Sequence, residues 1–185
     1  MSGPVSEYNP EFEYLGEEIV WEGRIIKAGR ERFRFADGSE VSREKVWHPG
    51  AVAIIALDET QVWLTRQPRE VVRETASLEV PAGKLDVAGE EPLAAAKREL
   101  VEEIGKTADT WRELFSFWPS PGFHDERLRL YVATDLHDID GGAQPEDGER
   151  IEIVPWLLSE LDSAIAACHD AKTLIALLWL AAGNR

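Results

Sequence analysis

The sequence is poor in cysteine and in positive charge. Cys168 is its only cysteine, so an internal disulfide bond or a metal site built from several thiolates is excluded, and we interpret Cys168 as a small core residue. Lys and Arg number 20 against 35 Asp and Glu, which gives a net charge of −15 at pH 7. Such a surface repels the phosphates of nucleic acids and of anionic lipids. We therefore expect no nucleic acid and no membrane among the partners.

Long apolar segments are also lacking. The first 20 residues have neither the basic start nor the apolar stretch of a secretory signal. The apolar run TLIALLWLAAG near the C-terminus is much shorter than the ~20 residues that span a bilayer. We therefore expect a cytoplasmic protein. With 185 residues, 44% of them apolar, the chain is long enough for one well-buried core, or for a core with a small additional layer.

The N-terminal part shows the pattern of a small β-rich segment. Residues 1–16 are polar and acidic and contain two prolines, and we expect a loose arm there. Residues 17–48 alternate apolar and polar side chains around a turn at Asp37 and Gly38, which is typical of antiparallel strands. We predict an N-terminal segment over residues 1–47 and a second domain over residues 48–185.

The second domain shows strand and helix patterns in alternation. Strands are predicted for AVAIIAL (51–57), QVWLTRQ (61–67), WRELFSFW (111–118), RLRLYVATDL (127–136) and RIEIVPW (150–156). A helix is predicted over residues 91–104, because Pro92 stands near its start, apolar residues recur at helical spacing and Gly105 follows it. Two further helices are predicted within 157–170 and 171–183. The fold class is therefore α/β.

Three carboxylates crowd the first predicted helix in the stretch RELVEE (98–103). Glu102 and Glu103 follow Glu99 by three and four residues, so all three share one side of the helix. Like charges at this spacing destabilise an isolated helix by roughly 0.2–0.5 kcal/mol per pair. A bound divalent cation would offset the repulsion, because Mg²⁺ and Mn²⁺ prefer oxygen ligands. A solvated acidic face is the alternative.

The spacing around these carboxylates resembles the Nudix box, G-x5-E-x7-R-E-U-x-E-E-x-G-U, in which U is a bulky aliphatic residue. From Glu90 onward, seven of the eight specified positions match. One extra residue lies between Gly83 and Glu90, where it lengthens a loop, and loops tolerate such changes. Lys106 replaces the final U and removes an apolar anchor after the helix. We expect little functional consequence from that replacement.

The Nudix resemblance implies a fold and a cation site. The implied fold is an α/β/α sandwich with a mixed sheet, here preceded by the small antiparallel β segment. The implied cofactor is Mg²⁺ or Mn²⁺, bound by the carboxylates of Glu99 and Glu103 and by the backbone carbonyl of Ala82. Glu102 is implied as a further or water-mediated ligand.

Flanking segments narrow the resemblance to the ADP-ribose pyrophosphatase branch over roughly residues 17–156. The segments that carry it include LTRQPRE, LEVPAGKLD, SPGFHDERLRLYVAT and PEDGERIEIVPW. The implied reaction is hydrolysis of ADP-ribose to AMP and ribose 5-phosphate. The implied assembly is a homodimer, in which the N-terminal segment reaches the partner subunit.

The resemblance also implies residues that serve catalysis. Glu102 and Arg98 are predicted to do so, Arg98 through an ion pair with Glu90 that orients the carboxylates. The general base is predicted in the loop PEDGERIE, where Glu149 matches the family pattern best. Glu146 and Asp147 are rivals, and a solvated acidic loop is the alternative to all three.

Five residues are predicted to contact the substrate: Arg69, Arg66, Glu79, Ser120 and Glu126. Arg69 would bind a phosphate, for which an Arg fork is well suited, and Arg66 is the weaker candidate. Glu79 would bind ribose hydroxyls or act as a strand or capping residue. Ser120 and Glu126 would face the site from the loop SPGFHDE, or serve only its turns.

Three further residues and two further functions stay open. His124 is interpreted as an ordinary loop histidine rather than a base, and Trp21 and Trp47 are candidates to stack on adenine or to pack in the core. A Nudix hydrolase of another nucleotide sugar, NADH or a dinucleoside polyphosphate is the first alternative. A non-catalytic module that senses such a nucleotide is the second.

Overall fold

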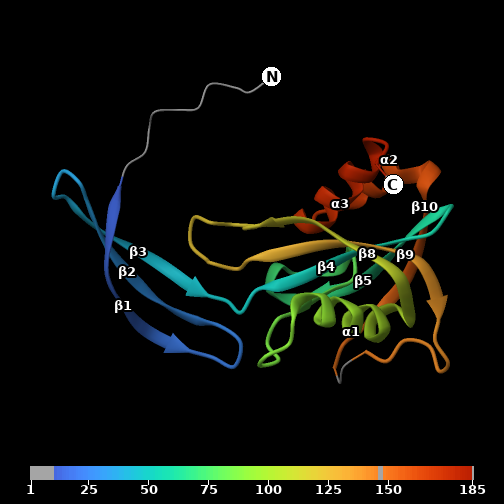
Figure 1. Cartoon of the computed structure of the whole chain (residues 1–185), viewed down its shortest axis with the longest axis horizontal. Helices are drawn as coiled ribbons and strands as arrows, with labels where there is room; N and C mark the ends of the chain where they lie inside the picture. The colour runs from blue at the N-terminus through green and yellow to red at the C-terminus, as the bar shows by residue number, and fades with distance from the viewer. Residues whose placement is uncertain (1–10, 146–147, 185) are drawn as a thin grey trace. The chain divides into compact units, whose positions relative to one another are not determined.

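The computed structural model describes residues 11–145 and 148–184 (Figure 1). The chain divides into two compact units. Within the described residues, the first contains 11–48 together with 120–126, and the second contains 49–119, 127–145 and 148–184. The division after His48 lies next to the predicted boundary, whereas the assignment of 120–126 to the first unit was not predicted. Within the described ranges, no helix is long and apolar enough to cross a membrane.

The first unit is a three-stranded antiparallel sheet in the order β1 (Phe12–Glu22), β2 (Lys27–Phe35) and β3 (Glu40–Trp47). The predicted turn joins β2 to β3, with Gly38 at φ +84°. The prediction of a loose arm is wrong for residues 12–16, which belong to β1 because their aromatic side chains pack across the sheet. The Phe12 ring centroid lies 5.3 Å from that of Phe33. Residues 1–10 lie outside the described residues.

Backbone bonds attach residues 120–126 to the first unit. Val46 on β3 donates its N–H to the Phe123 carbonyl at 2.8 Å and accepts the N–H of Asp125 at 3.3 Å. The Asp125 carboxylate accepts the N–H of His48 at 2.9 Å and forms an ion pair with Lys45 at 2.9 Å. These bonds join residues more than 70 positions apart, so local sequence patterns do not reveal them.

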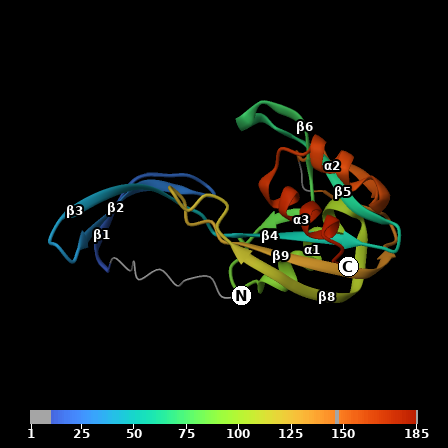
Figure 2. The same cartoon turned by 90° about the horizontal axis from the view of Figure 1, so that it is seen from above.

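The second unit is built on a mixed sheet. Its main strands run in the order β10 (Glu152–Leu157), β5 (Gln61–Arg69), β4 (Ala51–Leu57), β9 (Leu128–Asp138) and β8 (Lys106–Phe117). Two short strands complete it: β6 (Glu74–Glu79) pairs with β5, and β7 (Ala82–Lys84) pairs with β4. The pair β4–β9 is parallel and the other pairs are antiparallel. The hairpin of β5 and β6, with a 3₁₀ turn (Glu70–Val72) at its tip, extends beyond the rest of the sheet (Figure 2).

Helices cover both faces of this sheet (Figure 1). The helix α1 (Pro92–Ile104) lies on one face, and α2 (Leu161–Ala167) and α3 (Ala171–Ala181) lie on the other, after a 3₁₀ turn (Leu158–Glu160). Even-numbered residues of β4, such as Ile54, pack in the core that contains Leu100 of α1. Odd-numbered residues, such as Ile55, pack in the core that contains Leu177 of α3 and the buried Cys168. The predicted α/β/α sandwich with an N-terminal antiparallel sheet is therefore confirmed.

Lys106, where the box expects an aliphatic residue, is buried directly after α1. It is 7% exposed, and its ammonium lies 3.8 Å from the centroid of the Trp63 ring and pairs with Asp138. The position is thus still filled by a packed side chain, whose aliphatic stem is buried while the charge meets an aromatic face. The sequence pattern alone indicates that an apolar anchor is lost at this position, because it does not reveal that Trp63 packs against Lys106.

We predict that Lys106→Ala lowers the free energy of unfolding by about 2 kcal/mol, because it removes both the buried stem and the contact with Trp63. Lys106→Met keeps the stem and loses less than about 1 kcal/mol. Urea unfolding of each variant measures these differences, with Lys97→Ala on the exposed side of α1 as a control that stays within about 0.5 kcal/mol of the unchanged chain. Equal stability of Lys106→Ala and the unchanged chain would contradict the assigned contact.

Candidate active site

Glu99 and Glu103 pack against the backbone of β7. A Cβ added to Gly83 would lie 1.8 Å from a carboxylate oxygen of Glu99, so only glycine lets Glu99 approach this closely. One turn later, the Glu103 carboxylate accepts the N–H of Ala82 at 3.1 Å. The two carboxylates therefore lie on the same side of α1, beside the residue whose carbonyl is predicted to complete the cation site.

Arg98 joins three carboxylates through one guanidinium group. Its Nε and Nη2 atoms donate to the two oxygens of Glu90, each at 3.2 Å. Its Nη1 atom donates to Glu99 at 2.8 Å and to Glu102 at 2.7 Å. These contacts raise the pKa of Arg98, and the largest contribution comes from the hydrogen bonds that Arg98 donates to Glu90. The guanidinium is therefore a permanent charge that orients the carboxylates.

Burial makes the charged forms of Glu99 and Glu103 unfavourable. It raises the pKa of Glu103 to about 8, with repulsion from Glu99 and Glu149 acting in the same direction and the Ala82 N–H opposing. Burial also raises the pKa of Glu99 to about 7, although Arg98 opposes the shift and Glu102 and Glu149 add to it. Both carboxylates therefore lack sufficient compensating positive charge, which a divalent cation would supply.

The described residues contain no set of three or more Asp, Glu, His or Cys side chains arranged to enclose a metal ion. Glu99 and Glu102 are instead turned toward Arg98. This arrangement still fits Mg²⁺, because that ion keeps several waters and is usually held by one or two carboxylates together with substrate phosphates. Two observations support this fit to Mg²⁺: the carboxylates are hard oxygen donors, and the buried charges of Glu99 and Glu103 are not fully compensated by nearby cations.

The loop that carries Glu149 is tied to the end of α1. Ile139 donates its N–H to the Gly105 carbonyl at 3.1 Å, and Gln144 donates its N–H to the Glu102 carbonyl at 2.9 Å. Gly105 permits this approach, because a Cβ there would lie 2.5 Å from the backbone nitrogen of Ala143. The negative charge of Glu149 reaches Glu99 and Glu103, as their raised pKa values record.

Glu146 and Asp147 are the rival candidates for the general base. Glu146 and Asp147 lie outside the described residues. The assignment of Glu149 as the base stays a prediction, supported by its electrostatic proximity to the carboxylates of α1.

Arg69 and Glu79 form a two-bond ion pair beside a cavity of about 600 Å³. Nε and Nη2 of Arg69 donate to the two oxygens of Glu79, each at 2.7 Å. Lys172 of α3 also donates to Glu79, whose side chain is 2% exposed. Burial alone would raise the pKa of Glu79, but the bonds from Arg69 and the charge of Lys172 lower it to about 2. Glu79 is therefore ionised throughout the neutral range.

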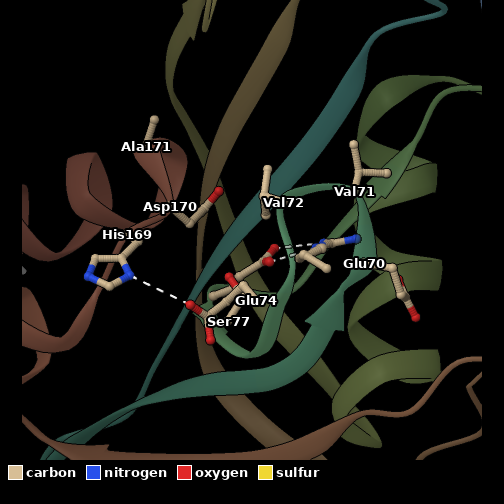
Figure 3. A pocket seen from close by; sticks show the side chains of 10 residues that line it. Glu70, Val71, Val72, Glu74, Ser77, His169, Asp170 and Ala171 are labelled. Carbon is tan, nitrogen blue, oxygen red and sulfur yellow. Dashed lines mark hydrogen bonds and ion pairs between the residues drawn. The ribbon is translucent and has the colours of Figure 1, made fainter.

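The cavity lies between the β5–β6 hairpin and the start of α3 (Figure 3). Besides Arg69 and Glu79, its lining consists of Glu70, Val71, Val72, Glu74, Ser77, His169, Asp170 and Ala171. His169 and Glu74 face each other across it, with 3.8 Å between their nearest nitrogen and oxygen atoms. A positively charged fork, a hydroxyl group and several carboxylates could together bind a phosphate and sugar hydroxyls.

Other predicted contacts lie elsewhere. Arg66 does not line the cavity and instead pairs with Glu152 on β10 at 3.6 Å. Ser120 and Glu126 belong to the first unit, where the Glu126 carboxylate lies 3.9 Å from His48. The roles of these three residues in substrate binding stay predictions.

His124, Trp21 and Trp47 also lie in the first unit. His124 accepts the N–H of Glu126 at 3.2 Å, as an ordinary loop histidine would. Trp21 is 54% exposed, and its ring covers Gly23, where a Cβ would meet it at 2.2 Å. Trp47 is partly buried, with the Lys45 ammonium 5.1 Å from its ring centroid. Their part in adenine stacking stays a prediction.

Lys172 and Asp170 were not singled out from the sequence. The order Asp170, then Thr173 three residues later, is a helix-capping signal, and Asp170 does accept the Thr173 N–H at 3.0 Å. That signal predicts where α3 begins, but it does not predict that Lys172 of α3 contacts Glu79. The contact of Lys172 with Glu79 spans 93 positions, and only the folded chain shows it.

Comparison with known proteins agrees with this architecture. The sequence matches the NUDIX domain over residues 47–176, so the chain belongs to the Nudix family and is a Nudix hydrolase. It is 34% identical to an ADP-ribose pyrophosphatase of Bacillus subtilis (strain 168), with 90% of each chain covered. It is 37% identical to a methanol dehydrogenase activator of Bacillus methanolicus, covering 88% of this chain and 89% of the relative. A crystal structure of an ADP compounds hydrolase superposes with a TM-score of 0.79 at 25% identity, covering 98% and 100% of the two chains.

We predict a pH-dependent stability difference for Glu79→Gln. Because the pKa of Glu79 is lowered from 4.5 to about 2, its ionised contacts stabilise the fold above pH ~4.5, and this contribution declines as pH falls toward 2. At pH 7 the variant should lose about 2 kcal/mol of unfolding free energy, since Arg69 is partly exposed and the full shift must be discounted.

Urea unfolding between pH 3 and pH 7 tests this effect. The difference between the unchanged chain and Glu79→Gln should narrow below pH ~4.5. Glu70→Gln, an exposed position at the tip of the same hairpin, provides the control and should show no such narrowing. A difference that stays constant over this pH range would show that ionised Glu79 is not the origin of the effect.

Proposed function

We propose that this Nudix hydrolase is a Mg²⁺-dependent pyrophosphatase that hydrolyses ADP-ribose to AMP and ribose 5-phosphate. The observation that carries the proposal is the pair of buried carboxylates, Glu99 and Glu103, packed against β7 with too little positive charge nearby. The similarity to an ADP-ribose pyrophosphatase supports this choice of substrate.

The residues have separate tasks in the proposed reaction. Glu99, Glu103 and the Ala82 carbonyl would hold the cation, with Glu102 as a further ligand. When bound, the cation neutralises charge on the phosphate oxygens and lowers the pKa of a water molecule. Glu149 accepts a proton as the water oxygen bonds to one phosphorus of the pyrophosphate. The bond from that phosphorus to the bridging oxygen breaks, and this oxygen leaves with the other phosphate.

Two residues orient the participants without accepting the proton. Arg98 orients the carboxylates of Glu90, Glu99 and Glu102 through its ion pairs with them. Arg69 binds a substrate phosphate through the part of its guanidinium that does not bond Glu79, because the N–H donors of arginine are well suited to phosphate oxygens. Arg66, Ser120 and Glu126 remain proposed contacts of the same substrate.

The alternatives differ in the group attached to the diphosphate. Another nucleotide sugar, NADH or a dinucleoside polyphosphate would use the same cation site with a different pocket fit. A non-catalytic sensing module is the second alternative, but the Glu99, Glu102 and Glu103 carboxylates that such a module need not keep are all present.

We expect ADP-ribose to be cleaved fastest among ADP-ribose, GDP-mannose, NADH and diadenosine polyphosphate, with AMP and ribose 5-phosphate as products. Product analysis by chromatography with purified protein and Mg²⁺ measures this order. EDTA should abolish turnover, and excess Mg²⁺ should restore it. Faster cleavage of another substrate would overturn the proposed specificity, and binding of ADP-ribose without cleavage of any substrate would favour the sensing module.

The same assay tests the assigned residues. Glu103→Gln removes a cation ligand and Glu149→Gln removes the base, so each should lower kcat at least about 100-fold. Glu59→Gln, at an exposed position in the turn between β4 and β5 that does not line the cavity, is the matched control for a lost carboxylate and should leave kcat within about twofold. If Glu149→Gln retains activity while Glu146→Gln or Asp147→Asn loses it, the base belongs to one of those residues instead.

We also infer a homodimer formed through the first unit. Among the described residues of this unit, no hydrophobic side chain is buried, while Phe12, Tyr14 and Trp21 are each more than half exposed. Such a sheet gains a core only when another surface covers it. A second copy of the chain is the partner that the family resemblance suggests.

Sedimentation equilibrium checks the assembly. A dimer gives a mass near twice the chain mass of 20.7 kDa. Phe12→Ser combined with Trp21→Ser should shift the protein toward the monomer, because these substitutions remove exposed apolar area from the interface. A monomer mass for the unchanged chain at micromolar concentration would contradict the inference.

A further inference from the structure

Glu79 lies between two cations from distant elements. Arg69 at the end of β5 approaches it with two parallel bonds of 2.7 Å, and Lys172 in the first turn of α3 donates to the oxygen that also accepts Arg69 Nη2. Glu79 is almost fully buried and Lys172 is 13% exposed, whereas the Arg69 side chain is 44% exposed. The contact therefore links a buried carboxylate to an arginine that borders the cavity.

Part of the Arg69 guanidinium remains available for a ligand. Within the described residues, its hydrogen bonds go to Glu79 through Nε and Nη2, and its Nη1 atom makes none. Arg69 itself lines the cavity. A long side chain loses much rotamer freedom when it binds a phosphate, so prior fixation of the guanidinium plane lowers the cost of recognition.

Lys172 is itself rigidly placed. Asp170 accepts the Thr173 N–H at 3.0 Å and pairs with the Lys172 ammonium at 3.1 Å. The Thr173 hydroxyl accepts the N–H of Val80 at 2.8 Å, which ties the first turn of α3 to the residue after Glu79. Lys172 therefore meets Glu79 from a helix already bonded to the end of β6, before any ligand binds.

The contact also lies within electrostatic reach of the carboxylates of α1. The charge of Lys172 lowers the pKa of Glu103, as one of several smaller influences after the dominant effect of burial. The charge of Glu103 in turn contributes to the raised pKa of Arg69, whose main cause is its bond with Glu79. The cavity and the candidate cation site are thus neighbouring parts of one unit.

We propose that Lys172 is a positioning residue for phosphate recognition: through Glu79, it holds the guanidinium of Arg69 in place with Nη1 available to a ligand in the cavity. The proposal rests on the proposed function in one respect, namely that Arg69 binds a phosphate of the substrate. Lys172 contacts no substrate and acts only through the Glu79 carboxylate. Without Lys172, that buried carboxylate keeps a single, partly exposed cation as its partner, and Arg69 becomes mobile.

A double-mutant cycle on the hydrolysis reaction tests this coupling. Lys172→Met should raise KM about tenfold while kcat stays within threefold, because recognition is weakened and no cation ligand is removed. In an Arg69→Ala background, Lys172→Met should change KM less than twofold, since its effect passes through Arg69. Lys172→Arg should return KM to within about threefold of the unchanged chain, and the exposed Lys97→Met is the matched control. Equal effects of Lys172→Met in both backgrounds would show a merely structural role and overturn the proposal.

A second readout needs no substrate. In protein labelled with ¹⁵N-arginine, the Nε–H resonance of Arg69 should exchange slowly with water and should broaden or shift in Lys172→Met but not in Lys97→Met. An unchanged Arg69 resonance overturns the proposal whatever the substrate is. A changed resonance in a protein that cleaves none of the tested substrates supports the positioning role and places the failure in the proposed function. If Lys172→Met does not fold, Lys172→Gln replaces it in both experiments.

Discussion

The burial of Glu99 and Glu103 against the backbone of β7 is the constraint around which the second unit is arranged. Two carboxylates one helical turn apart are held where water cannot fully solvate them, and burial raises their pKa values to about 7 and 8. Gly83 gives Glu99 its space, Ala82 bonds Glu103, and Arg98 joins the outer side of the cluster to Glu90. Ionised Glu99 and Glu103 repel each other in this buried position. A divalent cation would relieve that repulsion, and the relief would contribute to the free energy of cation binding.

A third buried glutamate in the same unit shows the opposite behaviour. Glu79 is as inaccessible as Glu103, yet its pKa falls to about 2 because Arg69 and Lys172 compensate its charge. The pKa values of Glu79 and Glu103 differ because Glu79 has cationic partners, and not because the two side chains differ in depth of burial. The charge of Glu79 is thus compensated within the chain, whereas the charges of Glu99 and Glu103 would be compensated by the cation of the proposed function. The two sites lie close enough for their charges to interact. The proposed diphosphate substrate would meet a cation at one site and an arginine at the other.

Sequence reasoning recovered the elements whose patterns are local. The apolar run of β4, the helix from Pro92 to Gly105 and the spacing of Glu99, Glu102 and Glu103 all follow from neighbours within a few residues. It failed where a partner is distant in sequence. Phe12 belongs to β1 because Phe33 packs on it, Lys106 is accommodated because Trp63 lies beneath it, and 120–126 joins the first unit through Val46. The contact of Glu79 with Lys172 was not predicted for the same reason, since Lys172 is 93 positions away, and the binding of ribose hydroxyls by Glu79 stays a prediction.

The alternating packing of β4 has a consequence for how the second unit opens. Its even-numbered side chains complete the core under α1, and its odd-numbered side chains complete the core under α2 and α3. Neither helical layer can detach without exposing one face of β4, the most buried strand. The two cores therefore unfold together and not independently. We therefore regard the second unit as a single cooperative body, in which the amide hydrogens of β4 exchange only when both layers separate together. The candidate cation site and the neighbouring Arg69 cavity both belong to this body and are thereby protected by the same global free energy.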